Sequence, residues 1–261
     1  MRKLGLCSLL VFLAAGCHRN KATEVEPSHP NFVALSVAPA AVDSIWRKAV
    51  SDFREGDWKH ARKNFERLNL SFQPGDPRAP QSHFFLAECM LAQGENLQAT
   101  REFRKVADDY ATDSLAPEAL LRTGDAYVEL WHRPELDPTY GQNALATYQE
   151  VITRFPGTSA AGRAEKRVDE LNDMFAYKSY KSALYYYRLK AYDSAILYLK
   201  DLLSNYPKSN IAGDALVKLV QSYHKIGYLE DLKDTCDYLH QYHPEQHGAD
   251  DVCPRPSPGS S

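Results

Sequence analysis

The chain has 261 residues, 25% of them charged, and a formal net charge of −3 at neutral pH. This balance excludes the basic excess expected of a nucleic-acid-binding protein, and a hydrophobic content of 44% is enough for a substantial core. The sequence contains no His-Glu-x-x-His, no Gly-x-Ser-x-Gly and no phosphate-binding glycine loop. We therefore expect a protein that is not an enzyme, with no cofactor and no metal.

The N-terminal residues 1–16 have the order of a secretory signal, with Arg2 and Lys3 followed by a short apolar run and Gly16. The run is about half of the ~20 residues that a membrane-spanning helix needs, which indicates a cleaved signal. The letters Leu-Ala-Ala-Gly-Cys, ending at Cys17, resemble a bacterial lipobox. That resemblance implies a lipid on Cys17; an ordinary secretory signal with a cysteine nearby is the open alternative.

Three zones follow the signal. Residues 17–40 contain prolines and scattered charges without a helical period, which predicts a flexible tether of about 25 Å root-mean-square span. Residues 41–243 are helical in pattern almost throughout, and we divide them into N-terminal repeats 41–112 and C-terminal repeats 113–243. Residues 244–261 are rich in Pro and Ser, which predicts a disordered tail.

The helical zone repeats one unit: a turn residue, then an alanine, then a large residue four positions later. The copies are Ala61 with Phe65, Ala99 with Phe103, Ala144 with Tyr148, Ala195 with Leu199, and a weaker one at Leu232. Small residues let two helices approach closely, and large residues fill the gap between them. This spacing resembles the tetratricopeptide repeat and predicts an all-α fold, a right-handed α-solenoid of five tetratricopeptide-like helix pairs.

We expect ten helices, paired in chain order. They span 42–54, 57–70, 79–93, 95–110, 115–131, 139–155, 159–190, 192–206, 210–226 and 228–242. The third pair contains an inserted loop, and there Gly124 takes the role of the small residue. The seventh helix is unusually long because no proline interrupts it, and we expect it to tie two halves of the solenoid together.

The third pair and the long helix carry a more specific resemblance. The carrying segments are Trp131-His132-Arg133-Pro134-Glu135-Leu136-Asp137-Pro138, Arg154-Phe155-Pro156-Gly157, the series Tyr177, Tyr180, Ala183, Tyr186, Tyr187, and Asn205-Tyr206-Pro207. Together with the lipobox they resemble the outer-membrane assembly lipoprotein family BamD, also called YfiO. The resemblance covers about residues 13–242 and is strongest over 115–226.

This resemblance implies a lipid-anchored scaffold on the periplasmic face of the outer membrane. Its implied partners are a periplasmic POTRA domain of the barrel-inserting protein BamA and unfolded β-barrel precursors. The C-terminal repeats would carry the BamA contact, for which Tyr180, Tyr187 and Tyr198 are the candidates. Tyr198 stands where many members have an arginine, which disfavours a salt bridge there. Packing of the tyrosine stripe against neighbouring helices is the alternative.

The N-terminal repeats are the implied precursor site. Trp46 and Arg47 in the first helix and Phe84 and Phe85 in the third are the candidates, because first helices line the concave surface of such solenoids. Packing between repeats is the competing interpretation for each aromatic. A different cell-envelope tetratricopeptide lipoprotein, acting as a peptidoglycan- or secretion-associated adaptor, is the alternative function.

The C-terminal histidines and cysteines leave two questions open. Cys236, His240 and His243 would share a helix face and suit zinc, but Pro244 should end the helix first, so we disfavour a metal site. A metal-dependent protein remains the third functional hypothesis. Cys236 and Cys253 either pair in an oxidising periplasm or stay free thiols.

Overall fold

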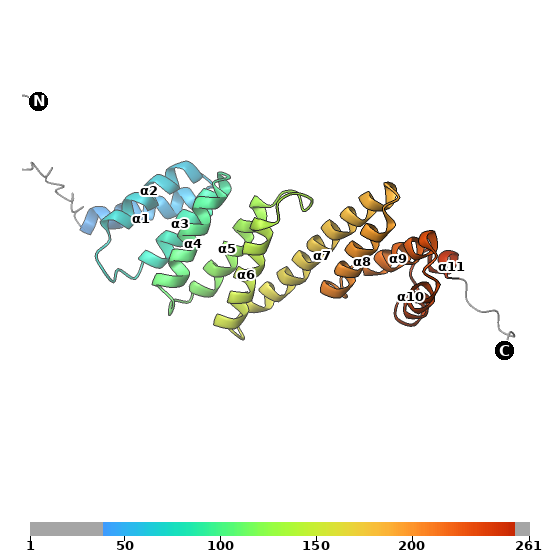
Figure 1. The fold of residues 1–261 in the computed structure, drawn as a ribbon. Coiled ribbons are helices and arrows are strands. Elements are labelled where there is room, and N and C mark those ends of the chain that lie inside the picture. Colours follow the sequence, from blue (N-terminus) through green and yellow to red (C-terminus); the bar gives the residue numbers. More distant parts are fainter. Residues whose placement is uncertain (1–38, 254–261) are drawn as a thin grey trace, which may run out of the picture. The chain divides into compact units, whose positions relative to one another are not determined.

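The computed structural model describes residues 39–253, and within that range the chain forms helices and no strands. The helices are α1 (Pro39–Arg54), α2 (Trp58–Ser71), α3 (Ala79–Ala92), α4 (Asn96–Asp109), α5 (Ala116–Leu130), α6 (Thr139–Arg154), α7 (Ser159–Arg188), α8 (Tyr192–Asn205), α9 (Ala212–Ile226), α10 (Leu229–Tyr242) and α11 (Ala249–Val252) (Figure 1). The first ten are the predicted ones, with ends that differ by three residues at most. Cys17 and the signal lie outside the described residues. No helix in the described range is long and apolar enough to cross a membrane.

Consecutive helices pack against each other, so the fold is a helical solenoid of helix pairs. The markers of the first four predicted copies form its core: Ala61, Phe65, Ala99, Phe103, Ala144, Tyr148, Ala195 and Leu199 are all fully buried. Leu232 of the weaker fifth copy is only partly buried. Gly124 does take the small-residue role, because a methyl group there would overlap the ring of Tyr148. Alternation of small and large residues thus lets each pair close without leaving a gap.

Helix ends follow the local signals in the sequence. The α9 helix ends at Gly227, whose φ of 77° is the left-handed conformation that glycine adopts without strain. The fourth pair has Lys190 at the equivalent turn, with a φ of 61°. Thr158 begins the long α7 helix by accepting a hydrogen bond from the Ala161 amide at 3.2 Å.

The long α7 helix joins two hydrophobic clusters, as predicted. Leu171 and Phe175 pack into the cluster of the third pair, whereas Ala176 and Ala183 pack into that of the fourth and fifth. A 30-residue helix therefore continues from one part of the core to the next.

The inserted loop of the third pair is held against α7. Trp131 is 3% exposed, and its ring centroid lies 4.7 Å from that of Phe175. From the other side Gly141 approaches so closely that any side chain would overlap the indole. Lys178 donates hydrogen bonds to the carbonyls of Glu135 and Leu136 at 2.9 and 2.6 Å. The loop is thus a fixed part of the fold.

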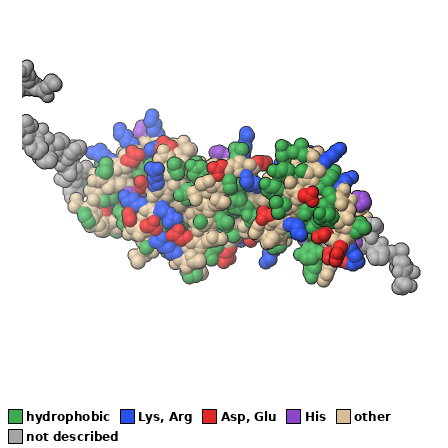
Figure 2. Space-filling view, in the orientation of Figure 1, with side chains coloured by type: hydrophobic (Ala, Val, Ile, Leu, Met, Phe, Trp, Pro, Cys, Tyr) green, Lys and Arg blue, Asp and Glu red, His purple; other side chains and the backbone are tan. Residues whose placement is uncertain are grey.

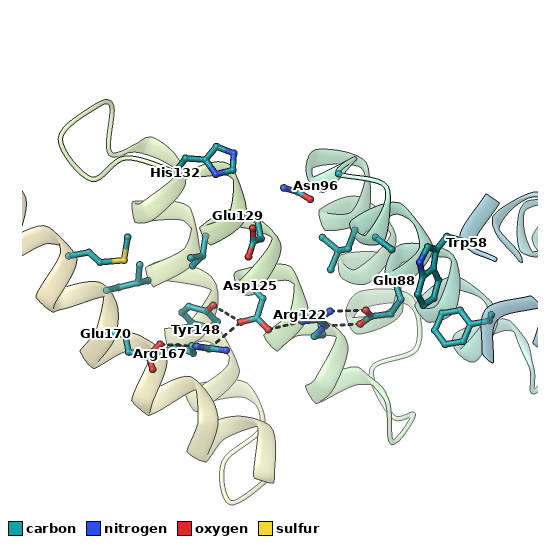
Figure 3. Close-up of a pocket in the computed structure, with 17 residues that line it drawn as sticks. Trp58, Glu88, Asn96, Arg122, Asp125, Glu129, His132, Tyr148, Arg167 and Glu170 are labelled. Carbon is teal, nitrogen blue, oxygen red and sulfur yellow. Dashed lines mark hydrogen bonds and ion pairs between the residues drawn. The ribbon is translucent and has the colours of Figure 1, made fainter. Parts of the chain in front are cut away.

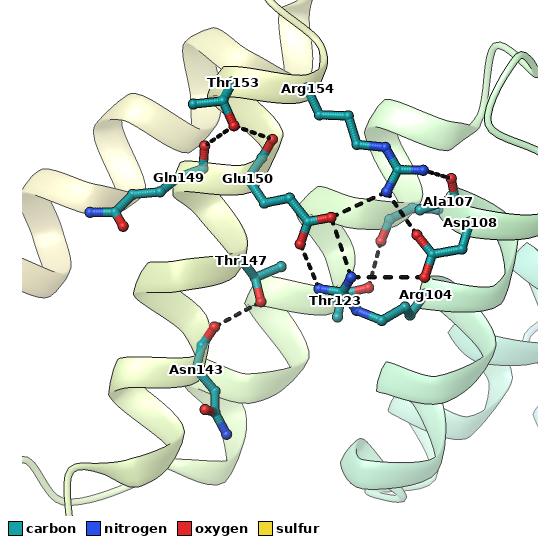
Figure 4. Close-up of polar contacts among 11 residues, drawn as sticks. Arg104, Ala107, Asp108, Thr123, Asn143, Thr147, Gln149, Glu150, Thr153 and Arg154 are labelled. Carbon is teal, nitrogen blue, oxygen red and sulfur yellow. Dashed lines mark hydrogen bonds and ion pairs between the residues drawn. The ribbon is translucent and has the colours of Figure 1, made fainter.

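A polar cluster fastens the second helices of pairs two and three to each other (Figure 4). Arg154 on α6 bonds Asp108 and the Ala107 carbonyl of α4 at 2.7 and 2.6 Å. Glu150 on α6 pairs with Arg104 of α4 at 2.8 Å. The hydrogen bond from Arg104 is the largest cause that holds the pKa of Glu150 below its usual value.

The tail prediction was wrong for residues 244–253. Here the chain turns back, forms α11 and buries Ala249 and Cys253 against Leu216 of α9 and Leu239 of α10. A disulfide joins Cys236 to Cys253, which answers the open question about these cysteines. The covalent bond and the apolar contacts together order a segment whose composition alone favours disorder. Residues 254–261 lie outside the described range.

Candidate protein-binding sites

A groove with a volume of about 760 Å³ runs across α3, α5 and α7 (Figure 3). These are the first helices of the second, third and fourth pairs, as expected for the concave side of a solenoid. Its apolar lining includes Phe53, Leu91, Val128, Leu171 and Met174. A groove of this size suits a polypeptide segment or several side chains.

A chain of charged side chains crosses the groove from α3 to α7. Arg122 on α5 donates two hydrogen bonds of 2.7 Å to Glu88 of α3 and one of 3.2 Å to Asp125. Arg167 of α7 lies 3.4 Å from Asp125 and 2.8 Å from Glu170. Each arginine thus bridges carboxylates, which fixes the three helices relative to one another and satisfies most of the charge in the groove.

Tyr148 completes this network from beneath. Its hydroxyl donates a 2.7 Å hydrogen bond to Asp125, while its ring is fully buried against Gly124. Burial, followed by the nearby Asp125 carboxylate, raises the pKa of Tyr148 well above its ordinary value. The phenol is therefore a permanent donor at neutral pH, and it orients Asp125 between Arg122 and Arg167.

The predicted precursor residues do not lie in this groove. Phe85 stacks on Phe53 at 4.5 Å and Phe84 meets Phe103 edge-on at 5.2 Å, so part of each ring packs against the core. Trp46 contacts the core, and with the exposed Arg47 it lines a separate pocket of about 340 Å³.

The groove instead uses side chains that the sequence did not single out. Phe53 and Trp58 line its N-terminal end, and Trp58 remains 36% exposed. One feature of the sequence could have pointed to Trp58 as a groove residue. It lies next to the turn between two helices, and a neighbouring helix pair buries such a position less than the middle of a helix.

The three predicted BamA-contact tyrosines have different surroundings. Tyr180 is half-buried in the core, and Tyr187 is turned toward α9, where the Lys218 ammonium lies 4.5 Å from its ring centroid. Tyr198 stacks on Tyr186 at 5.3 Å, and Tyr186 meets Tyr185 edge-on at 5.4 Å. We call Tyr185, Tyr186 and Tyr198 the tyrosine ladder. It links α7 to α8.

Exposed apolar residues accompany the ladder. Tyr185 is 53% exposed, and Leu189 and Leu197 are 60% and 68% exposed. Figure 2 shows apolar side chains gathered over this end of the α7–α8 hairpin. Exposure on this scale, near aromatic side chains, is typical of a protein-interaction surface.

His240 lies in the last turn of α10, and His243 follows the last residue of that helix. No group of three or more metal-ligating side chains occurs among residues 39–253, and Cys236 is consumed by its disulfide. The Cys236 sulfur, which the metal-dependent hypothesis needs as a ligand, is therefore not available as a thiolate while the disulfide is intact.

Two relatives extend along most of the chain. It is 25% identical over 225 residues to the outer membrane protein assembly factor BamD of Xylella fastidiosa, covering 82% of this chain and 73% of that protein. It is 29% identical over 208 residues to the BamD of Rickettsia prowazekii, covering 80% and 82%.

Solved tetratricopeptide-repeat proteins are similar to parts of the fold. One from Parabacteroides merdae has a TM-score of 0.37 at 17% identity, covering 81% of this chain and 72% of that one. A Thermus thermophilus protein has a TM-score of 0.35 at 20% identity, covering 80% and 95%. The model of the YfiO family, described as outer membrane lipoprotein, matches residues 40–239. Because that match spans most of the chain, the protein belongs to the YfiO family.

Proposed function

We propose that this protein is a lipid-anchored scaffold for the assembly of outer-membrane β-barrel proteins. The observation that carries the proposal is the YfiO family match over residues 40–239. Relatives named outer membrane protein assembly factor BamD, which align along most of their length, support it. In this proposal a lipid on Cys17 holds the chain on the periplasmic side of the outer membrane.

The C-terminal repeats bind a periplasmic POTRA domain of a BamA-like protein. The tyrosine ladder and Leu197 support this assignment, because aromatic side chains are enriched in interface cores. Tyr198 then contributes ring contact in place of an arginine's charge. Tyr180 offers less contact area to a partner than the ladder does, since it is half-buried in the core.

The groove across α3, α5 and α7 binds an unfolded β-barrel precursor. Its apolar lining suits the alternating apolar side chains of such strands. Its central charges are already paired, so they add little specific attraction. That pattern fits clients of many sequences, because contacts to apolar side chains depend little on their order. The precursor site thus lies in this groove instead of at Phe84 and Phe85.

A pull-down with matched surface variants tests the BamA contact. Tagged protein solubilised in detergent should recover a BamA homologue. The double variant Tyr185→Ser with Leu197→Ser should lose it. The control Tyr228→Ser with Leu229→Ser removes side chains of nearly equal exposure, 50% and 71%, from the α9–α10 turn and should retain it. Recovery of only unrelated proteins, or equal loss in both variants, would contradict the proposal.

Site-specific photo-crosslinking tests the groove. A photoreactive residue at the exposed groove position Glu129 should crosslink to a denatured barrel precursor, whereas one at the exposed Glu230 on α10 should not. Equal crosslinking at both positions would refute the groove as the precursor site.

Depletion of the protein separates the main proposal from the alternative. Loss of outer-membrane barrels supports the assembly role. Normal barrel levels with a different envelope defect would favour the adaptor function.

Cys17→Ala should abolish lipid labelling; unchanged labelling would refute the anchor.

A further inference from the structure

The α2 helix carries a basic outward face. Lys59, Lys63 and Arg67 recur at every fourth residue, and Leu70 lies in the same stripe at helical spacing; all four are exposed. Ala61, Phe65 and Leu68 occupy the opposite side and are fully buried. We call Lys59, Lys63, Arg67 and Leu70 the basic face. Figure 2 shows Lys and Arg side chains protruding over α2.

The charges on this face are not neutralised within the protein. Four cations and one carboxylate lie on α2, and the carboxylate, Glu66, already accepts a 2.9 Å hydrogen bond from Arg62. Within residues 39–253, Lys59, Lys63 and Arg67 have no ion-pair partner. Other exposed cations of the described residues are unpaired as well, but these three share one face of one helix.

An apolar side chain accompanies the cations. Leu70 is 90% exposed, although its neighbours two and five positions before it are fully buried. Exposing a leucine to water is unfavourable relative to burying it in an apolar environment. A helix face of cations plus an apolar residue is the pattern of helices that contact a lipid surface, where headgroup phosphates meet the cations.

We propose that the basic face of α2 binds the anionic phosphate headgroups of a membrane surface. The α1–α2 pair is the first after the predicted lipid on Cys17, with about 20 residues between them. A lipid on a long tether restricts distance but not orientation, whereas contact through α2 would hold the first pair flat against the headgroups. The inference rests on the membrane location in the proposed function and not on the BamA contact.

Vesicle binding of the unacylated mature chain tests the proposal. The protein comprises residues 17–261 with Cys17→Ser; the helical unit carries its own hydrophobic clusters and needs no acyl chain for its core. The probes are phosphatidylcholine vesicles with and without phosphatidylglycerol. We expect binding to the anionic vesicles only, weakening as salt is added.

Two charge-matched triple variants locate the contact. The α2 variant is Lys59→Gln, Lys63→Gln, Arg67→Gln, and the control is Lys166→Gln, Lys200→Gln, Lys225→Gln. Both remove three exposed cations that have no ion pair within residues 39–253. We expect the α2 variant to lose on the order of 100-fold in vesicle affinity, because each cation contributes about a factor of five to ten near an anionic surface. The control should bind as the parent does.

Three results would overturn the proposal: equal weakening of both triple variants, parent-like binding by the α2 variant, or binding that ignores lipid charge. Leu70→Ser keeps every charge and should weaken vesicle binding by a smaller factor than the triple variant does. Because it changes one exposed side chain, it tests the same face if the triple variant fails to fold. If the α2 variant binds vesicles as the parent does but no longer recovers an acidic protein in pull-downs, the basic face binds a protein partner instead of a membrane. None of these outcomes depends on recovery of a BamA homologue, so the two proposals can fail separately.

Discussion

Breaking the Cys236–Cys253 disulfide should loosen the C-terminal end of the solenoid and leave the N-terminal repeats unchanged. The bond closes a loop of 17 residues, for which chain entropy predicts a stabilisation of about 3 kcal/mol. Without it, α11 is a single turn held by apolar contacts of Ala249 and Val252. A helix of that length has no stability of its own.

The loss should be local because each repeat contacts only its neighbours. When α11 leaves, Val220 and Leu239, both almost fully buried, face water. Opening of the last pair should then become easier by about 3 kcal/mol, which corresponds to an increase in amide exchange rate on the order of 100-fold. Amides of α3 and α4 belong to a different hydrophobic cluster and should exchange as before.

Hydrogen exchange measured by mass spectrometry tests this with the double variant Cys236→Ser, Cys253→Ser. The parent protein in reductant should match the variant, and reductant should have no further effect on the variant. The free thiol Cys89 is buried in α3 and provides an internal reference for effects of reductant alone. Unchanged exchange in α10, or equal acceleration in α3, would refute the reasoning.

Three further predictions concern single positions. Gly141→Ala should lower the free energy of unfolding in urea by about 1–3 kcal/mol, because the new methyl group overlaps Trp131. In Gly162→Ala the methyl group points into open space on α7, so the free energy of unfolding should rise by up to about 1 kcal/mol. Equal effects of the two substitutions would contradict the packing argument. Cys89, whose pKa is raised by burial to about 12, should resist alkylation at pH 8 until the protein unfolds, and rapid labelling of native protein would be incompatible with its burial. The pKa of Glu150 is lowered from its ordinary value of 4.5, so its contribution to stability is present above that value and is lost as the pH falls through the lowered pKa. Urea midpoints should therefore drop as the solution is acidified below pH 4.5, and they should drop less in Glu150→Gln.

Helix pairing was predictable because its signals are local. Ala61 and Phe65 are four residues apart on one helix face, and that spacing alone places both at the interface of a pair. Turn residues and prolines mark helix ends without reference to the rest of the chain. The long α7 helix followed from the absence of such breaks between Ser159 and Arg188.

The short α11 helix could not be predicted in the same way. Its four residues, Ala249–Val252, are too few to show a helical period, and two of them are aspartates. Its position depends on a disulfide to Cys236, seventeen residues earlier. Pairing of cysteines is a tertiary property that composition does not reveal.

The candidate sites show a further limit of the sequence. Phe84, Phe85 and Trp46 belong to the expected first helices, yet all three are partly buried against the N-terminal core cluster and none lines the groove. Periodicity assigns a residue to a face of its own helix, but whether a neighbouring pair covers that face depends on how the pairs stack. For this reason Phe53 and Trp58 at the groove, and the exposed Leu197 beside Tyr198, became visible only in the structure.

The α7 helix makes the two candidate binding surfaces parts of one rigid element. Arg167 and Glu170 lie in the groove, and Tyr185 of the tyrosine ladder follows on the same unbroken helix. At a rise of 1.5 Å per residue, Arg167 and Tyr185 are separated by about 27 Å along the helix axis. The groove lining extends along α7 to Met174, which lies about 17 Å from Tyr185 along the helix axis. In the proposed function, a precursor in the groove and a partner protein at the ladder would therefore contact different parts of the same helix. The paired charges across α3, α5 and α7 keep the distance between these two surfaces constant.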